Sequence, residues 1–344
     1  MQKQKDTDCH IHNDSVISLR SASFCYSYLV IRSSETRAME AEVEGVHEYP
    51  LIHSIHTHII KYGSIDEQRR LVLVIPGNPG AVEFYDEFMK TLHFSSKWPV
   101  WGLSHAGHSI VPRRVGWKNP DQSVFTVTGQ IEHKLSFINR FVPDDVKIVL
   151  IGHSIGAHVV LEMLDILPSE RVLEGMLLFP TIEKMAQSPQ GRWLTPLLRN
   201  MKWLFMLIAA FLWLLPYTMK CRMIDYVFDR RGRRFPGTIA PCIKQGAHSA
   251  IDPYCLSNTL HMANLEMQEV DEINEGLVRK HIDKTRYYYG ATDHWCPKQH
   301  YYDMKERFPD HDKIELCSDG FRHAFIIDAS RPMAAKVSEW LKLL

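Results

Sequence analysis

One serine, one acid and one histidine stand in an order that could support nucleophilic acyl transfer. Ser154 is the centre of the sequence GHSIG at 152–156, which matches the pattern G-x-S-x-G. Asp293 and His323 follow it along the chain. A serine hydroxyl is a weak nucleophile at neutral pH, so it needs a histidine base, and that base needs a carboxylate to orient it. We therefore predict a catalytic triad of these three residues.

The context of Ser154 predicts a nucleophile elbow, a sharp turn between a strand and a helix. Residues 147–151 form an apolar, β-branched run typical of a buried strand. A helical pattern follows, with apolar residues on one side at Val159, Val160, Met163, Leu164 and Leu167. Glycines two residues either side of the serine allow the close approach that such a turn needs. The neighbouring histidines, His153 and His158, could line the pocket or simply pack near the sheet, and neither is expected to be catalytic.

The acid and the base follow later strands, but each has a rival. Asp293 stands four residues beyond a predicted strand at 285–289, and His323 follows a last strand at 313–317. In proteins with such an elbow the acid precedes the histidine along the chain, and both stand on loops at the carboxyl ends of later strands. This order favours Asp293 and His323. Asp319 is an alternative acid, although it is close to His323 on one loop. His311 is an alternative base, although it precedes the last strand.

Two backbone N–H groups are predicted to form an oxyanion hole. One belongs to Ile155, the residue after the nucleophile. The other should come from the loop PGNPG at 76–80, where Pro79 has no N–H, so Asn78 is the candidate. The alternative is that residues 76–80 form only a tight turn.

Strands and helices of similar size alternate along much of the chain. A strand or hairpin is expected at 49–61, and buried strands at 71–75, 98–103, 147–151, 175–179, 285–289 and 313–317. Helices are expected at 82–92, at 126–141, after the elbow, and at 334–344. This alternation predicts a doubly wound and mostly parallel sheet with an inserted helical cap.

The alternation of strands and helices begins only after about residue 45 and is interrupted once. We therefore predict an N-terminal extension, a core in two parts and an insertion between them. The polar start, residues 1–45, is expected to be a disordered extension. The hydrolase core then occupies 46–182 and 284–344. Between them, 183–283 is expected to form a helical insertion for the cap and for membrane association.

The composition argues against several classes of partner. Lys and Arg together number 40, as do Asp and Glu, so no charge excess points to nucleic acid. The seven cysteines are odd in number and lack C-x-x-C spacing, which argues against a disulfide framework and a zinc site. The 19 histidines include no H-E-x-x-H sequence, so we expect no metal and no organic cofactor.

The most apolar stretch, residues 203–215, lies in the insertion. No apolar segment reaches the ~18 to 20 residues of a bilayer-spanning helix, and this one would be about 20 Å long. It is either a buried cap helix or a segment that dips into a lipid surface. The second hypothesis assigns membrane association to Trp203, Leu207, Phe211, Trp213 and Leu214. The arginines at 230–234 would then meet anionic headgroups.

Several motifs together resemble the lipid droplet-associated hydrolase family, over about residue 50 to the C-terminus. They are PGNPG at 76–80, SHAGH at 104–108, GQIEHK at 129–134, LIGHSIG at 150–156, LFPTIE at 178–183, YG at 289–290, WCP at 295–297 and HAFII at 323–327. The resemblance implies an α/β-hydrolase fold and a serine hydrolase acting on sterol esters, without cofactor. It also implies location on lipid droplets and the endoplasmic reticulum. The family's nucleophile, acid and base fall on Ser154, Asp293 and His323.

We therefore predict a cytosol-facing esterase that cleaves lipid esters at a droplet surface. Two alternatives come from other functional classes. One is a weakly active or non-enzymatic droplet scaffold or tether that keeps the fold, since fold does not guarantee activity. The other is a hydrolase of small soluble esters or thioesters, with the insertion as an ordinary lid.

Overall fold

The computed structural model of the chain describes residues 44–65, 68–112, 121–234 and 240–344, and only the backbone of 229–234. The chain divides into two compact units, Met1–Glu44 and Gly45–Leu344, and the fold is that of the second unit. The predicted extension at 1–45 lies outside the described residues, apart from its last two residues.

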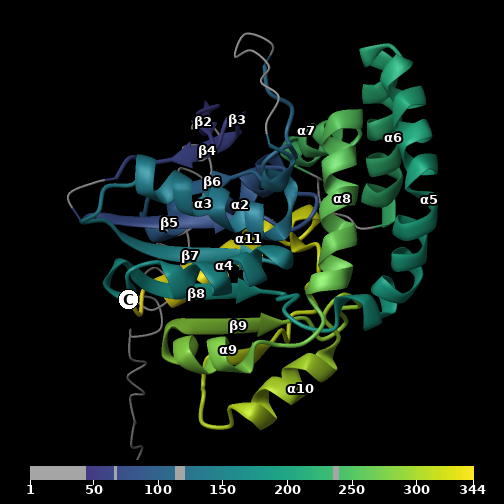
Figure 1. Cartoon of the computed structure of the whole chain (residues 1–344). Coiled ribbons are helices and arrows are strands. Elements are labelled where there is room, and N and C mark those ends of the chain that lie inside the picture. The colour runs from purple at the N-terminus through teal and green to yellow at the C-terminus, as the bar shows by residue number, and fades with distance from the viewer. Residues whose placement is uncertain (1–43, 66–67, 113–120, 235–239) are drawn as a thin grey trace, which may run out of the picture. The chain divides into compact units, whose positions relative to one another are not determined.

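Within these residues, eight strands form one sheet in the order β1, β4, β6, β5, β7, β8, β9, β10 (Figure 1). The strands from β6 to β10 in that order pair in parallel, whereas β4 and β1 are added antiparallel at one edge. Their bounds are β1 (Val46–Glu48), β4 (Ile59–Tyr62), β5 (Arg70–Ile75), β6 (Val100–Leu103), β7 (Lys147–His153), β8 (Val172–Leu178), β9 (Thr285–Tyr289) and β10 (Ile314–Leu316). A separate hairpin joins β2 (Leu51–Ile52) to β3 (Ile55–His56). The predicted doubly wound, mostly parallel sheet is confirmed.

The central strand, β7, has neighbours on both sides. It pairs with β5 and β8, and every residue from Ile148 to His153 is buried. Helices cover both faces of this sheet, so its side chains are apolar without alternation. At the carboxyl end Ile75 is opposite Gly152, and His153 is opposite Leu178. The loops that follow these strands therefore meet at one edge.

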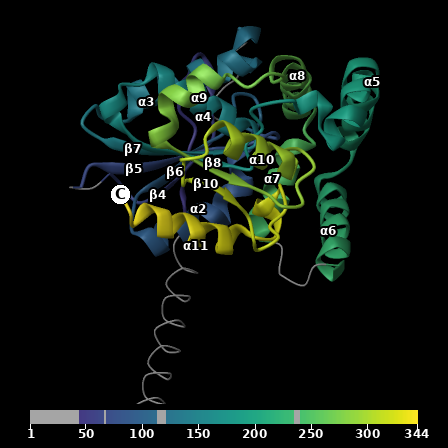
Figure 2. The same cartoon turned by 90° about the horizontal axis from the view of Figure 1, so that it is seen from below.

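Helices form a layer on each face of the sheet (Figure 2). One face carries α3 (Val127–Phe141), α4 (Ile155–Ile166) and α9 (Glu275–His281). The other carries α2 (Asp86–Ser96) and α11 (Ser330–Leu341), which pack against each other. Between β9 and β10 lies α10 (Lys298–Arg307). Short 3-10 turns occur at η1 (Val82–Tyr85), η3 (Gln122–Phe125), η4 (Ser169–Arg171), η5 (Met185–Gln187), η6 (Ile282–Lys284) and η7 (Phe325–Ile327).

Four helices between β8 and α9 form the cap. They are α5 (Pro189–Leu214), α6 (Tyr217–Arg234), α7 (Pro241–Ala250) and α8 (Pro253–Glu269). They stand beyond the edge toward which the parallel strands point (Figure 1), and α8 packs against α5. The same segment ends in α9, which packs on α4 in the layer over the sheet. The inserted helical cap of the predicted fold is therefore present.

Helix α5 is longer than the apolar run that the sequence predicted. It has 26 residues, with a non-helical Met201 (φ −125°, ψ 18°) between its two halves. In the described part of the chain it is the one helix long and apolar enough to cross a membrane by length and composition, and 11% of its apolar window is buried. The expectation that no segment reaches a bilayer-spanning length is corrected for this helix. The reason is that the helix continues upstream through polar residues that end the uninterrupted apolar run.

Candidate active site

Ser154 occupies a strained turn between β7 and α4. Its backbone has φ 55° and ψ −124°, in a region that residues other than glycine rarely adopt. A Cβ atom on Gly152 would lie 2.3 Å from the Gly156 carbonyl oxygen, and one on Gly156 would lie 2.4 Å from the oxygen of Ile75. Only glycines therefore fit on either side of the serine. The turn holds Ser154 at the N-terminus of α4, where free N–H groups favour negative charge.

The structure brings together the three residues of the predicted triad. Nε2 of His323 lies 2.9 Å from Oγ of Ser154, and Nδ1 of His323 lies 2.6 Å from Oδ2 of Asp293. Asp293 follows β9 and His323 follows β10, so both side chains reach the serine from carboxyl ends of strands. In this arrangement the imidazole can take the serine proton while the carboxylate faces its other nitrogen.

Asp293 is buried, and its carboxylate accepts several hydrogen bonds. Its Oδ1 accepts hydrogen bonds from the backbone N–H groups of Trp295 (2.7 Å) and Cys296 (3.2 Å). Its Oδ2 accepts one from the Cys296 thiol (3.0 Å). Burial alone would raise the pKa of Asp293, but the His323 ring and these donors lower that pKa below its ordinary value. The carboxyl group is therefore an anion at neutral pH.

The two rival residues lie away from this constellation. Asp319 is exposed, and its described hydrogen bond is a 3.5 Å contact with the Ser318 hydroxyl. Nε2 of His311 lies 3.0 Å from the backbone oxygen of Thr285, at the start of β9. Neither contacts Ser154 in the described part of the chain.

The loop at 76–80 passes beside the nucleophile. A Cβ atom on Gly77 would lie 2.9 Å from Cβ of Ser154. The Gly77 N–H donates to the Tyr85 hydroxyl at 2.8 Å, so it is already engaged. No described residue accepts a hydrogen bond from the Asn78 N–H, and the N–H of Ile155 opens α4, where helices leave such groups without internal partners. The oxyanion role of these two amides stays a prediction.

His153 and Tyr85 line the same cavity and were not assigned a role from sequence. His153 is buried, and its Nε2 lies 2.8 Å from the backbone oxygen of His323. Burial, together with the smaller effect of the nearby His323 ring, lowers the pKa of His153 to about 3. The neutral ring can donate from Nε2 and hold the His323 loop in place. Tyr85 had been predicted only as an apolar position on a helix.

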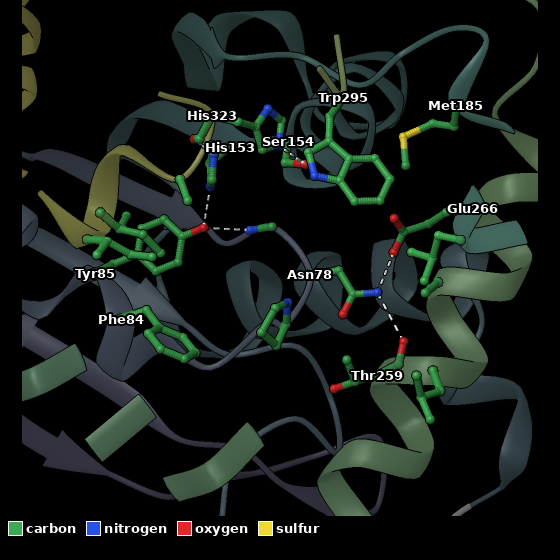
Figure 3. Close-up of a pocket in the computed structure, with 18 of the residues that line it drawn as sticks. Asn78, Phe84, Tyr85, His153, Ser154, Met185, Thr259, Glu266, Trp295 and His323 are labelled. Atoms are coloured by element: carbon green, nitrogen blue, oxygen red, sulfur yellow. Dashed lines mark hydrogen bonds between the residues drawn. The ribbon is translucent and has the colours of Figure 1, made fainter. Parts of the chain in front are cut away.

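A cavity of about 340 Å³ opens beside Ser154 (Figure 3). Its walls come from α5 and α8 of the cap and from the loops that follow β5, β9 and β10. Most of the lining is apolar, including Leu194, Leu198, Leu260, Met267 and Trp295. The cavity can therefore accept a hydrocarbon chain next to the serine.

Glu266 is a second residue that the sequence analysis missed. It lies on α8, is 3% exposed and lines the cavity opposite Asn78 (Figure 3). Nδ2 of Asn78 donates to Oε1 of Glu266 (2.8 Å) and to the backbone oxygen of Thr259 (3.1 Å). Burial raises the pKa of Glu266 to about 8. Its sequence signal is a carboxylate four residues after the buried Met262, on the apolar side of a helix.

Two further motifs, at 104–108 and 129–134, form a hydrogen-bond network next to the loop at 76–80. Nζ of the buried Lys134 donates to the Ser104 oxygen (3.0 Å) and to Oε1 of Gln130 (3.1 Å). The Gln130 side chain also accepts from the N–H of Ala106 at 2.8 Å. His108, on the same loop, accepts the N–H of Gly80 at Nδ1 (3.0 Å). The motifs at 104–108 and 129–134 therefore hold the loop at 76–80 in position.

One group of three potential metal ligands occurs in the described residues, and it overlaps the triad. Ligand atoms of Asp293, Cys296 and His323 lie within 4.8 Å of one another. Burial and the neighbouring Asp293 carboxylate raise the pKa of Cys296 well above its ordinary value, so the thiolate that binds metals is disfavoured. The hydrogen bonds among the three suit an acid–base pair rather than a metal site.

The residues predicted to associate with membranes lie on the outer half of α5. Trp203 is 60% exposed, Leu207 60%, Phe211 64%, Trp213 58% and Leu214 74%. Helix α6 adds further exposed apolar side chains at Tyr217, Met219, Met223, Tyr226 and Val227. A buried cap helix is therefore not what the described residues show. The side chains of the arginines at 230–234 lie outside the described residues.

The sequence is similar to a family of known hydrolases. A family model described as "Lipid-droplet associated hydrolase" matches residues 68–326. The lipid droplet-associated hydrolase of Gallus gallus is 38% identical over 305 residues, which cover 83% of this chain and 91% of that protein. The Homo sapiens protein of the same name is 35% identical over 328 residues, which cover 88% and 97%.

Solved structures with the same fold include several hydrolases. A membrane phospholipase A described as a bacterial virulence factor has a TM-score of 0.60 and 15% identity, covering 95% of this chain and 96% of that chain. An epoxide hydrolase from Vigna radiata has a TM-score of 0.57 and 14% identity, covering 88% and 98%. At such identities the likeness concerns the α/β-hydrolase fold alone.

Proposed function

Because the chain belongs to the lipid droplet-associated hydrolase family, we propose that it cleaves carboxylic esters of lipids, sterol esters among them, through a serine acyl-enzyme. The observation that carries the proposal is the contact of His323 with both Ser154 and Asp293. The strained elbow and the apolar cavity beside the serine support it further. The reaction would need no metal and no organic cofactor.

The first half of the reaction forms the acyl-enzyme. Nε2 of His323 takes the proton of Ser154 while Oγ bonds to the acyl carbon of the ester. The carbonyl oxygen becomes an oxyanion, and the N–H groups of Asn78 and Ile155 would stabilise it. The bond to the alcohol oxygen then breaks, and that oxygen receives the proton from His323. Asp293 stabilises the imidazolium that exists between these two transfers.

The second half returns the enzyme to its starting state. A water molecule gives a proton to His323 and bonds to the acyl carbon, and the same two amides would hold the second oxyanion. The bond to Oγ of Ser154 breaks, and the serine regains its proton from the histidine. The lipid ester is thereby converted to a carboxylic acid and an alcohol.

We further propose that the outer half of α5 binds the phospholipid monolayer of a droplet or the cytosolic face of the endoplasmic reticulum. Its exposed tryptophans and leucines form an apolar surface of the kind that marks interaction sites. Leu194 and Leu198, on the inner half of the same helix, line the cavity. A lipid ester leaving the monolayer would therefore enter beside the helix that binds it.

Labelling with a fluorophosphonate probe tests the enzymatic proposal directly. The wild-type protein should be labelled and the Ser154→Ala variant should not. Labelling of neither protein, with both folded by circular dichroism, would favour the droplet scaffold. Turnover of short soluble esters without any turnover of lipid esters presented on droplets would favour the hydrolase of small soluble esters.

A further inference from the structure

One wall of the apolar cavity carries polar groups that the acyl-enzyme mechanism leaves unused. Oδ1 of Asn78 is buried and has no hydrogen-bond partner within the described residues. Oε1 of Glu266 accepts from Asn78, but no described residue bonds to its Oε2. Both side chains face the cavity, on the side away from Tyr85 (Figure 3). Within the described residues, one acceptor and one carboxyl oxygen on this wall are therefore without a hydrogen-bond partner.

The protonation of Glu266 decides what this pair can bind. The pKa of Glu266 is raised to about 8, because burial outweighs the lowering effect of the Asn78 amide and Glu269 on the same helix adds a smaller upward effect. The other titratable groups lining the cavity are Tyr85, His153 and His323, which belong to the catalytic end. At neutral pH Glu266 is a neutral acid, and because Oε1 accepts from Asn78, the proton is on Oε2. The wall thus offers one donor and one acceptor.

A hydroxyl group matches that pair, since it donates one hydrogen bond and accepts another. We propose that Asn78 and Glu266 bind a free hydroxyl of the substrate, so that the preferred substrate is a hydroxyl-bearing lipid ester, such as a partial glyceride or a hydroxylated sterol ester. The inference rests on the proposed function, because the same cavity holds the scissile ester. A fully esterified lipid has only acceptors and leaves Oδ1 of Asn78 unpaired, which is costly in a buried site.

The same hydrogen bonds could serve a purely structural role. Glu266 and Thr259 both lie on α8, so they also hold the Asn78 side chain against the cap. A structural role predicts that replacing Glu266 weakens all ligands alike. A hydroxyl site predicts instead that the ratio between a hydroxylated ligand and its capped analogue changes. The ratio is therefore the quantity to measure.

The experiment measures dissociation constants with the full-length Ser154→Ala protein, which binds without turnover. One pair of ligands is a long-chain 1-O-alkylglycerol and the same ether with its hydroxyls capped as methyl ethers. A second pair is a sterol alkyl ether with and without an added hydroxyl, which distinguishes the two lipid sources. For at least one pair the hydroxylated member should bind roughly 10- to 100-fold more tightly, as expected when the capped member leaves a buried polar group without its hydrogen bond.

Two further substitutions of Glu266 separate the possibilities. Glu266→Gln keeps a neutral donor and acceptor and should retain the preference, whereas Glu266→Leu should reduce the ratio to about one. Above pH 8, where Glu266 loses its proton, the preference for the hydroxylated ligand should fall in the protein that retains Glu266. In Glu266→Gln the preference should persist. This comparison decides the matter if the leucine variant does not fold. Equal binding of both members in both pairs, or the same pH response with Gln, would overturn the proposal. Because no turnover is involved, failure here is distinct from failure of Ser154 to be labelled.

Discussion

The hydroxyl of Tyr85 lies 2.6 Å from Nδ1 of His153, and this contact joins the two loops that frame the nucleophile. The Gly77 N–H donates to the same hydroxyl, and the other nitrogen of His153 contacts the backbone oxygen of His323. The backbone oxygen of His323 can only accept, so Nε2 of His153 carries a proton, and in the neutral ring Nδ1 then accepts from the Tyr85 hydroxyl. The depressed pKa of His153 keeps its ring neutral at neutral pH. One chain of hydrogen bonds thus connects the loop at 76–80 to the backbone of His323, the proposed base.

Tyr85→Phe should impair turnover without removing any group that touches the substrate's reacting atoms. The Gly77 N–H and His153 Nδ1 would both lose their partner, so the loops on either side of Ser154 would be less well fixed. We expect kcat to fall roughly tenfold with KM little changed, less than the loss of an oxyanion donor itself. Steady-state kinetics on a soluble ester measure this. Tyr62→Phe is the matched control, because that buried tyrosine bonds to Asp86 outside the cavity, and an equal loss there would contradict the prediction.

Removing Ser154 or His323 should abolish ester hydrolysis and leave the fold intact. The two side chains act as one unit, so their losses are expected to be strongly non-additive, and the double alanine variant should be little worse than either single one. Initial rates, with circular dichroism to confirm folding, test this. A folded Ser154→Ala protein that hydrolyses lipid esters at the wild-type rate would show that the mechanism is wrong.

Asp293→Asn should reduce kcat by roughly 10⁴-fold with a modest change in KM, because the imidazole loses its orienting anion. The rival acid supplies the control. Asp319 is exposed and away from the triad, so Asp319→Asn should retain nearly full activity. A larger defect from Asp319→Asn than from Asp293→Asn in the same kinetic assay would show that the acid is misassigned.

The sequence predicted the sheet and the chain order of the triad because both depend on local patterns. Strand β9 begins and ends at the predicted residues, and strand β7 extends the predicted run by two residues to the elbow. Parallel strands place their carboxyl ends at one edge, so a polar residue just after each strand is a candidate without any knowledge of distant contacts. That reasoning led to Asp293 and His323, which the structure places next to Ser154.

The polar partners inside the cavity could not be predicted in the same way. In the sequence, Tyr85 is one of several apolar residues at helical spacing. Nothing in that pattern indicates its partner, because His153 is 68 residues away. The position of Glu266 on the apolar side of α8 does not reveal its partner, because Asn78 is 188 residues away in the sequence. Such pairs depend on how the cap sits on the sheet, and hydrophobic periodicity carries no information about that. Helix α5 illustrates the same limit, because the sequence left open whether its apolar run is buried in the cap or exposed.

Acid should destabilise the protein through histidines, such as the partly buried His158, that stay neutral in the folded state. Burial lowers the pKa of His158 to about 4 from an ordinary 6.5. Between those values the unfolded chain binds the proton and the folded chain does not, so stability falls as the pH falls from 6.5 toward 4. His158→Gln should reduce that slope by at most about 1.4 kcal/mol per pH unit. Urea unfolding at pH 4.5 to 7 measures it, and an unchanged slope would contradict the assignment.

The outer half of α5 offers a lipid surface a continuous apolar face. Leu207, Phe211 and Leu214 follow one another at helical spacing, and each is more than half exposed. Leu198, on the inner half of the helix, is buried and lines the cavity. The two halves of α5 therefore have separable roles, and the outer one can be changed without entering the active site.

Replacing Leu207, Phe211 and Leu214 with serine should release the protein from droplets into the soluble fraction. The reason is that binding scales with the apolar area the helix can bury in the monolayer, and these three side chains supply much of it. Hydrolysis of a soluble short-chain ester should be retained, since none of the three lines the cavity. Flotation of droplets followed by quantification of the bound protein measures the release. A matched control replaces Val46, Ile166 and Tyr302, which are exposed to 59%, 61% and 49% but lie outside the cap, and this variant should remain on droplets. Retention of the folded α5 variant on droplets would place the anchor elsewhere, and its unfolding would show that the outer half of α5 stabilises the cap.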